Sequence, residues 1–178
     1  MDRLLETFVT DARAAAVSDE PTSAVRGVLE DALTRADAFA ALIAAQADDE
    51  VHLFEDETVS IWTCRFWPDV ILPPHEHTIP VHIGVVGGVE RNILYRRLYG
   101  ELLQVFEKEV GRGDMLSMGA DGIHAVTAAG PDPSLALHVY LGPLMQVERS
   151  LFNWRTGAAM PFTDANFEAM KRSSRAAG

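Results

Sequence analysis

The hydrophobic period of the sequence changes near Asp49, and this change limits the possible folds more than any other feature. Before it, apolar residues recur at steps of three and four, which is the pattern of amphipathic helices that pack by one face. After it, short runs rich in β-branched and aromatic residues are separated by glycine and proline, which is typical of strands joined by turns. The sequence therefore predicts helices within residues 1–48 and a strand domain over residues 49–178, with a short helix near its end.

Two amphipathic helices are predicted in the N-terminal part, one around Leu4–Ala12 and one around Val25–Ala36. Pro21 stands where the first turn of the second helix tolerates a proline. Near the other end of the chain, Thr163 is suited to cap a short closing helix that runs to Met170. The two N-terminal helices are expected to pack on the outside of the strand domain.

Six apolar runs predict strands. They cover residues 58–67, 79–86, 92–98, 102–110, 123–128 and 135–141. Turn sequences such as Gly87-Gly88 and Gly111-Arg112-Gly113-Asp114 separate them at the spacing of an antiparallel barrel or a jelly roll. A chain of 178 residues is long enough for one such core and too short for two ordinary domains. The expected fold class is therefore mainly β, with an N-terminal helical appendage.

The charge of the chain excludes two classes of partner. The formal net charge is -11, and lysine and arginine form no cluster, so the basic surface that nucleic acid or an anionic membrane requires is missing. Cys64 is the only cysteine, which rules out an intrachain disulfide. We see neither a signal peptide nor an apolar run long enough to cross a membrane. The expectation is a cytoplasmic protein that binds a small-molecule substrate.

Three histidines form the motif with the clearest chemistry. His75 and His77 are two residues apart, so on an extended segment both imidazoles point to the same face. His124 follows the glycine turn that ends at Gly122, and it is suited to complete the set from a distant strand. Three imidazoles on one face form a metal site with open positions. The plainer alternative is a group of polar residues around the mouth of a barrel.

The arrangement of these histidines in a glycine-punctuated β-domain resembles the cupin superfamily. This resemblance implies a cupin-type double-stranded β-helix, that is, a jelly-roll barrel. The first cupin motif usually carries a glutamate ligand shortly after its second histidine, where this chain has Val81-His82. A three-histidine site without that carboxylate is similar to the thiol dioxygenases, the family of cysteine dioxygenase and 3-mercaptopropionate dioxygenase. The segments that carry the similarity are His75–Glu90 and His124–Tyr140.

The resemblance also implies roles for residues outside the histidine motif. Tyr140 and His138 correspond to the family's catalytic relay, in which Ala136 stands where the family has a serine. Arg149, nine residues after Tyr140, falls where the mercaptopropionate branch has an arginine that grips the substrate carboxylate. His82 is expected to contact the substrate beside the metal.

Each of these assignments has a plainer alternative. His138 and Tyr140 point to the same strand face and would equally form a packed aromatic pair. Arg149 would equally serve as an interior ion-pair partner of Glu90. His82 would equally be an interior histidine or a fourth metal ligand.

The resemblance implies a dioxygenase with non-haem iron(II), or another divalent metal, that uses O2 to oxidise a small thiol to its sulfinate. The segment Val51–Val59 lacks the arginine that cysteine dioxygenases use, so a 3-mercapto acid is the expected substrate. The alternatives are cleavage of a β-dicarbonyl or another enolisable compound at the same metal, and a small-molecule-binding cupin without catalysis. Leu102, Leu103 and Phe106 are expected either in the core or in the interface of a homodimer.

Overall fold

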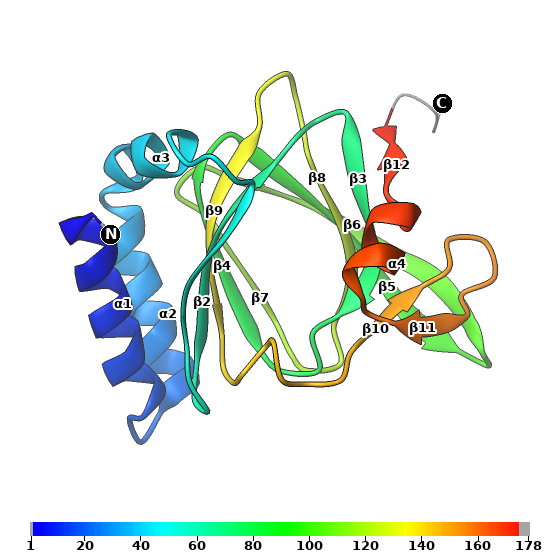
Figure 1. The fold of residues 1–178 in the computed structure, drawn as a ribbon, viewed down its shortest axis with the longest axis horizontal. Coiled ribbons are helices and arrows are strands. Elements are labelled where there is room, and N and C mark those ends of the chain that lie inside the picture. The colour runs from blue at the N-terminus through cyan, green and yellow to red at the C-terminus, as the bar shows by residue number, and fades with distance from the viewer. Residues whose placement is uncertain (1, 175–178) are drawn as a thin grey trace.

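The computed structural model describes residues 2–174 and shows a β-barrel with the N-terminal helices on one side and a short C-terminal helix on the other (Figure 1). Its helices are α1 (Arg3–Ala16), α2 (Pro21–Leu33), α3 (Ala36–Ala44) and α4 (Asp164–Met170). Its strands are β1 (Glu50–Glu55), β2 (Ser60–Phe66), β3 (Val70–Glu76), β4 (Val81–Gly87), β5 (Val89–Leu98), β6 (Glu101–Gly111), β7 (Met115–Met118), β8 (Ile123–Ala128), β9 (Ser134–Tyr140), β10 (Ser150–Phe152), β11 (Ala159–Pro161) and β12 (Arg172–Ser173).

The strands pair as a nested hairpin rolled into a barrel. One sheet has the order β1-β2-β9-β4-β7, and the other has the order β11-β10-β3-β8-β5-β6, while β12 joins β3. Within them β2 pairs with β9, β3 with β8, β4 with β7 and β5 with β6, all antiparallel. This is the pairing of a jelly roll. The predicted mainly β, double-stranded β-helix fold is therefore confirmed.

The N-terminal helices cover the outer face of the first sheet (Figure 1). Phe39 of α3 and Leu29 of α2 are fully buried there, against Leu137 and Val139 of β9. Gly84 of β4 permits this approach, since a Cβ atom at that position would lie 3.1 Å from Cδ2 of Leu29. None of the helices in residues 2–174 is both long and apolar enough to cross a membrane.

The helices differ from the sequence prediction in one respect. The second predicted helix, around Val25–Ala36, is split into α2 and α3 by a turn at Thr34 and Arg35. Apolar periodicity continues through this turn, which explains why the sequence does not mark it. The closing helix is as predicted, because Thr163 is the N-cap of α4 and its side chain accepts a hydrogen bond from the Asn166 amide at 3.2 Å.

The strand β3 carries the first histidine of the motif and is missing from the predicted strands. Pro73 and Pro74 lie inside it, and prolines usually argue against a paired strand. The pairing of β3 with β8 shifts register between Leu72 and His75, so the two prolines lie at an irregularity of the ladder. The ladder resumes at His75, which pairs directly with His124.

The hairpin β5–β6 ends the second sheet, and β6 is its edge strand. Leu103 is 41% exposed and Phe106 is 60% exposed on β6. The expectation that these residues lie in the core is therefore wrong. Their place in a homodimer interface stays a prediction.

Candidate metal centre

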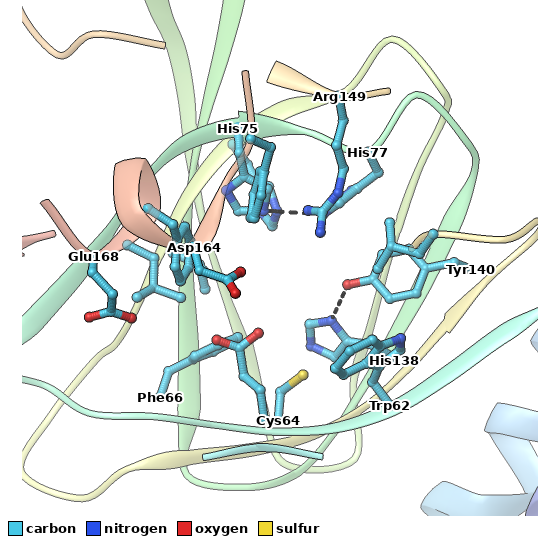
Figure 2. Close-up of a pocket in the computed structure, with 17 residues that line it drawn as sticks. Trp62, Cys64, Phe66, His75, His77, His138, Tyr140, Arg149, Asp164 and Glu168 are labelled. Carbon is cyan, nitrogen blue, oxygen red and sulfur yellow. Dashed lines mark hydrogen bonds between the residues drawn. The ribbon is translucent and has the colours of Figure 1, made fainter. Parts of the chain in front are cut away.

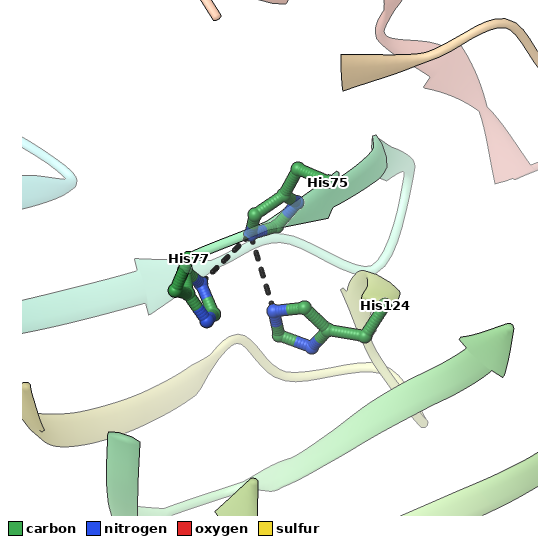
Figure 3. A group of neighbouring side chains, drawn as sticks. All are labelled: His75, His77 and His124. Carbon is green, nitrogen blue, oxygen red and sulfur yellow. Dashed lines mark hydrogen bonds between the residues drawn. The ribbon is translucent and has the colours of Figure 1, made fainter. Parts of the chain in front are cut away.

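His75, His77 and His124 meet inside the barrel (Figure 3). His75 lies near the end of β3, His77 just beyond that end, and His124 at the start of the neighbouring β8. The Nε2 atom of His75 is 3.1 Å from Nε2 of His77 and 3.1 Å from Nε2 of His124. All three residues are buried. The structure thus brings together the three histidines that the sequence predicts.

The partners of the rings decide which nitrogens face the centre of the cluster. Nδ1 of His75 is 2.9 Å from the carbonyl oxygen of Pro73, and Nδ1 of His124 is 2.6 Å from Oδ1 of Asn92. Since both oxygens only accept hydrogen bonds, both Nδ1 atoms carry the proton. The Nε2 lone pairs of these two rings are left to face the centre, which is the state in which imidazole binds a metal.

Burial keeps the cluster uncharged. It lowers the pKa of His75 to about 4 and holds the pKa values of His77 and His124 well below the ordinary value for histidine. The spacing also suits a metal ion. Two imidazole nitrogens that each lie about 2.1 Å from one ion, at roughly a right angle, are about 3 Å apart. The three residues therefore fit a divalent metal.

A cavity of about 260 Å³ opens beside the histidines (Figure 2). It has apolar walls, several carboxylates and one arginine. Its lining consists of Glu50, Trp62, Cys64, Phe66, Leu72, His75, His77, His124, Val126, His138, Tyr140, Leu144, Arg149, Phe162, Asp164, Phe167 and Glu168. The volume suits a ligand of a few heavy atoms.

The relay pair predicted from the sequence lies in this cavity. His138 and Tyr140 occupy alternate positions of β9, so both side chains point into the barrel. Nδ1 of His138 is 3.1 Å from the Tyr140 hydroxyl (Figure 2), and the Tyr140 ring centroid is 5.0 Å from that of His77. Burial raises the pKa of Tyr140 well above its ordinary value, so its hydroxyl stays protonated.

Arg149 reaches the cavity from the segment before β10, on the histidine side in Figure 2. Its guanidinium carbon lies 3.5 Å from the centroid of the Phe162 ring, a cation–π contact. The ion pairs among residues 2–174 do not include Arg149, so the alternative of an ion pair with Glu90 is wrong. Its five N–H donors are available to an anionic ligand.

His82 lies outside the cavity. In β4 the side chains of Val81, Ile83 and Val85 belong to the barrel interior, so His82 points to the opposite face. There its Nδ1 is 2.6 Å from the hydroxyl oxygen of Ser117. The expectation that His82 contacts the substrate is corrected by this position, and so is the alternative of a fourth metal ligand.

Two buried polar residues of β5 are close to the site, and their contacts with His124 and His138 were not predicted from the sequence. Asn92 holds His124, as described above, and its Nδ2 donates to Oε1 of Glu90 at 2.9 Å. Both residues are fully buried. Their alternate positions place them on the strand face of Leu94, which packs inside the barrel, but the sequence alone does not mark that face as the inner one.

Fold and site together define a jelly-roll protein with a three-histidine centre beside an internal cavity. No family model and no curated protein matches the chain. Among solved structures, it is similar to an uncharacterized conserved protein with a double-stranded β-helix domain from Klebsiella pneumoniae, with 13% identity over 65% of this chain and 87% of that one and a TM-score of 0.48.

Two enzymes show a comparable level of similarity. A hydroquinone 1,2-dioxygenase from Sphingomonas sp. is 11% identical over 57% of this chain and 71% of its own, with a TM-score of 0.47. A DMSP lyase from Ruegeria pomeroyi is 14% identical over 56% of this chain, with a TM-score of 0.45, and the match spans only 49% of the lyase. At such identities the similarity concerns the fold, and the activities of these proteins are their own.

Proposed function

We propose that this protein is a metal-dependent dioxygenase with iron(II) at His75, His77 and His124, which adds both atoms of O2 to a small thiol and yields a sulfinic acid. The expected substrate is a 3-mercapto acid. The observation that carries the proposal is that one cavity contains the three neutral imidazoles, the protonated Tyr140 and the unpaired Arg149.

Iron(II), when bound by three imidazoles, supplies the redox chemistry that dioxygen requires and keeps positions open for a substrate. The protein groups have separate tasks around it. Arg149 binds the carboxylate of the substrate through two parallel hydrogen bonds. Tyr140 presents its hydroxyl oxygen to the cavity, and His138 orients that hydroxyl through the contact at Nδ1.

The cavity walls protect this chemistry from water. Phe162 and Phe167 stack with ring centroids 5.1 Å apart, and both rings also contact the imidazole of His75. They cover the histidine cluster from the side of α4. A desolvated cavity strengthens the interaction between Arg149 and an anionic substrate, because the local dielectric constant falls.

The metal is tested by analysis of protein purified without added metal and then loaded with iron(II). We expect about one iron per chain in the wild type. Replacement of His75, His77 or His124 by alanine should remove most of the metal without unfolding the barrel, since the barrel core does not depend on a metal. His82→Ala is the matched control and should retain the metal. Stoichiometric iron in His124→Ala would contradict the ligand assignment.

The reaction is tested with an oxygen electrode on the iron-loaded protein. A 3-mercapto acid should consume one O2 per sulfinate formed, cysteine should react more slowly, and β-diketones should not react. A protein that consumes no oxygen with any thiol would overturn the proposal. Binding of thiols without turnover would favour the small-molecule-binding alternative.

Cleavage of a β-dicarbonyl is the second candidate, and Ala136 is the observation that favours it. This residue is fully buried on β9 and has no hydroxyl to extend the pair of His138 and Tyr140. The same iron-loaded protein would then consume oxygen with a diketone and not with a thiol. The oxygen-electrode panel separates the two reactions directly.

A further inference from the structure

Two buried polar atoms face each other behind the cavity without a hydrogen-bond partner. They are Oε2 of Glu90 and Nε2 of His138, which lie 3.7 Å apart. Glu90 is fully buried on β5, and His138 is 3% exposed on β9. A small movement of either side chain would close this gap to a hydrogen bond, and a buried carboxylate needs such a partner.

The other oxygen of Glu90 leads to the metal ligands. Oε1 accepts a hydrogen bond from Nδ2 of Asn92 at 2.9 Å, and this contact sets the orientation of the Asn92 amide. Oδ1 of Asn92 is thereby turned to Nδ1 of His124 at 2.6 Å. Since Oδ1 only accepts, Nδ1 of His124 carries the proton and Nε2 presents its lone pair to the cluster.

The Oε2 branch leads to Tyr140. With Oε2 of Glu90 as the acceptor, the His138 nitrogen that faces it, Nε2, is the donor and carries a proton. In the neutral ring Nδ1 is then the acceptor, and it receives the hydrogen bond of the Tyr140 hydroxyl at 3.1 Å. Both branches therefore end at groups that line the cavity, although Glu90 itself does not line it.

We propose that Glu90 is a positioning residue whose two carboxylate oxygens fix the ring tautomers of His124, through Asn92, and of His138. Ala136 of β9 has no hydroxyl with which to hold the His138 ring, and the Glu90 carboxylate orients that ring instead. The His124 tautomer follows from the hydrogen bonds of 2.9 and 2.6 Å through Asn92, and the His138 tautomer from the Tyr140 contact together with the 3.7 Å approach of Glu90. Only the consequence for turnover rests on the proposed function.

The substitution Glu90→Gln tests the proposal because an amide has the same shape as a carboxylate but accepts on one side only. Its NH2 group must face either His138 or Asn92. If it faces His138, the His138 ring must move its proton to Nδ1. If it faces Asn92, the Asn92 amide must turn over and His124 must move its proton to Nε2. The His138 contact is the longer one, so we expect that ring to change.

The ring tautomers are read from the nitrogen chemical shifts of the histidines in metal-free, 15N-labelled protein. In the wild type we expect the proton on Nε2 of His138 and on Nδ1 of His124. Glu90→Gln should invert one of these two rings, while His82 stays unchanged. Glu109→Gln, the same substitution at an exposed position of β6, should invert none. Unchanged tautomers of both rings in Glu90→Gln would overturn the proposal.

A second readout follows the metal through zinc binding to the metal-free protein. With the His138 ring inverted, zinc affinity should stay within about threefold of the wild type, whereas Asn92→Ala should weaken it by about ten- to a hundredfold. Equal zinc affinity of Asn92→Ala and the wild type would overturn the Asn92 branch. If Glu90→Gln does not fold, the wild-type spectrum still decides, because a proton on Nδ1 of His138 contradicts the proposal.

The outcome is separable from that of the proposed function. If the protein has the expected tautomers but oxidises no thiol, the proposed dioxygenase activity is wrong, while the positioning role of Glu90 is still supported. In an active enzyme, Glu90→Gln should lower kcat by about tenfold or more with an unchanged KM, because Tyr140 is misdirected while Arg149 is not. A changed KM with an unchanged kcat would contradict a role through Tyr140.

Discussion

The two sheets of the barrel differ in what covers them. Helices α1, α2 and α3 lie over the outer face of the sheet with β4 and β9, and every residue of these two strands is buried. The other sheet runs out to the edge strand β6 (Figure 1). Leu103, Val105 and Phe106 are exposed on this strand. The covered sheet therefore belongs to a larger apolar core than the open one.

The chemistry is divided between the same two sheets. His75 and His124 come from the second sheet, from β3 and β8, whereas His138 and Tyr140 come from β9 of the covered sheet. Glu90 of β5 is the link across the barrel. The comparison suggests that stability depends mainly on the helix-covered layer, and that the site depends on polar contacts between the inner faces of both sheets.

The largest expected effect on stability is that of Phe39→Ala in the covered layer. The Phe39 ring is fully buried and makes an edge contact with Phe8 at a centroid distance of 5.7 Å. Its loss should lower the free energy of unfolding by about 3 to 5 kcal/mol, measured by urea unfolding. Zinc stoichiometry of the folded fraction should not change. A loss of zinc binding with an unchanged free energy of unfolding would contradict the view that the helix-covered layer determines stability and not the metal site.

A smaller effect, on the reaction only, is expected for Tyr140→Phe. Loss of the hydroxyl should lower kcat for every thiol by about a hundredfold, since this group acts on the reaction and not on the carboxylate. KM should change little, and the unfolding free energy should change by about 1 kcal/mol. Tyr99→Phe, at the exposed tip of the β5–β6 hairpin, is the control and should have wild-type kinetics. An increase in KM alone would contradict the role of Tyr140.

The sequence predicts those features that local periodicity determines. Alternation along a strand is enough to place His75 and His77 on one face, and the turns mark the hairpins of the jelly roll. The sequence could not predict which side chains of β4 point into the barrel. This strand is buried on both sides, so no alternation of polar and apolar residues marks its inner face. This explains why His82 was assigned to the wrong side.

Glu90 and Asn92 show the opposite problem. Polar residues at alternate positions of a strand usually mark its solvent face, so β5 looks half exposed from the sequence. In the fold these two side chains point inward, because His124 and His138 from other strands provide their partners. His124 is 32 positions from Asn92, and His138 is 48 positions from Glu90. A pattern of neighbouring residues cannot reveal contacts at such separations.

Arg149, which directly precedes β10 of the open sheet, is tested by comparing thiols with and without a carboxylate. Arg149→Ala should raise KM for mercapto acids by about ten- to a hundredfold, equivalent to about 1.4 to 2.8 kcal/mol of lost charge-assisted hydrogen bonding. Neutral thiols should be almost unaffected, because they have no carboxylate to lose. Arg91→Ala, which removes an exposed arginine paired with Glu109, is the control. Equal losses for charged and neutral thiols would indicate general damage to the site.

The smallest effect is expected for Phe106→Ala, which repeats the substitution of Phe39 on the open sheet. The Phe106 ring is 60% exposed, and its direct cross-strand partner is Leu94. Most of its area is already in contact with water, so truncation leaves no cavity, and the expected cost is about 1 kcal/mol or less. A cost close to that of Phe39→Ala in urea unfolding would mean that another surface covers β6. In that case the loss should grow with protein concentration, and sedimentation should show that the wild type is a homodimer which the variant fails to form.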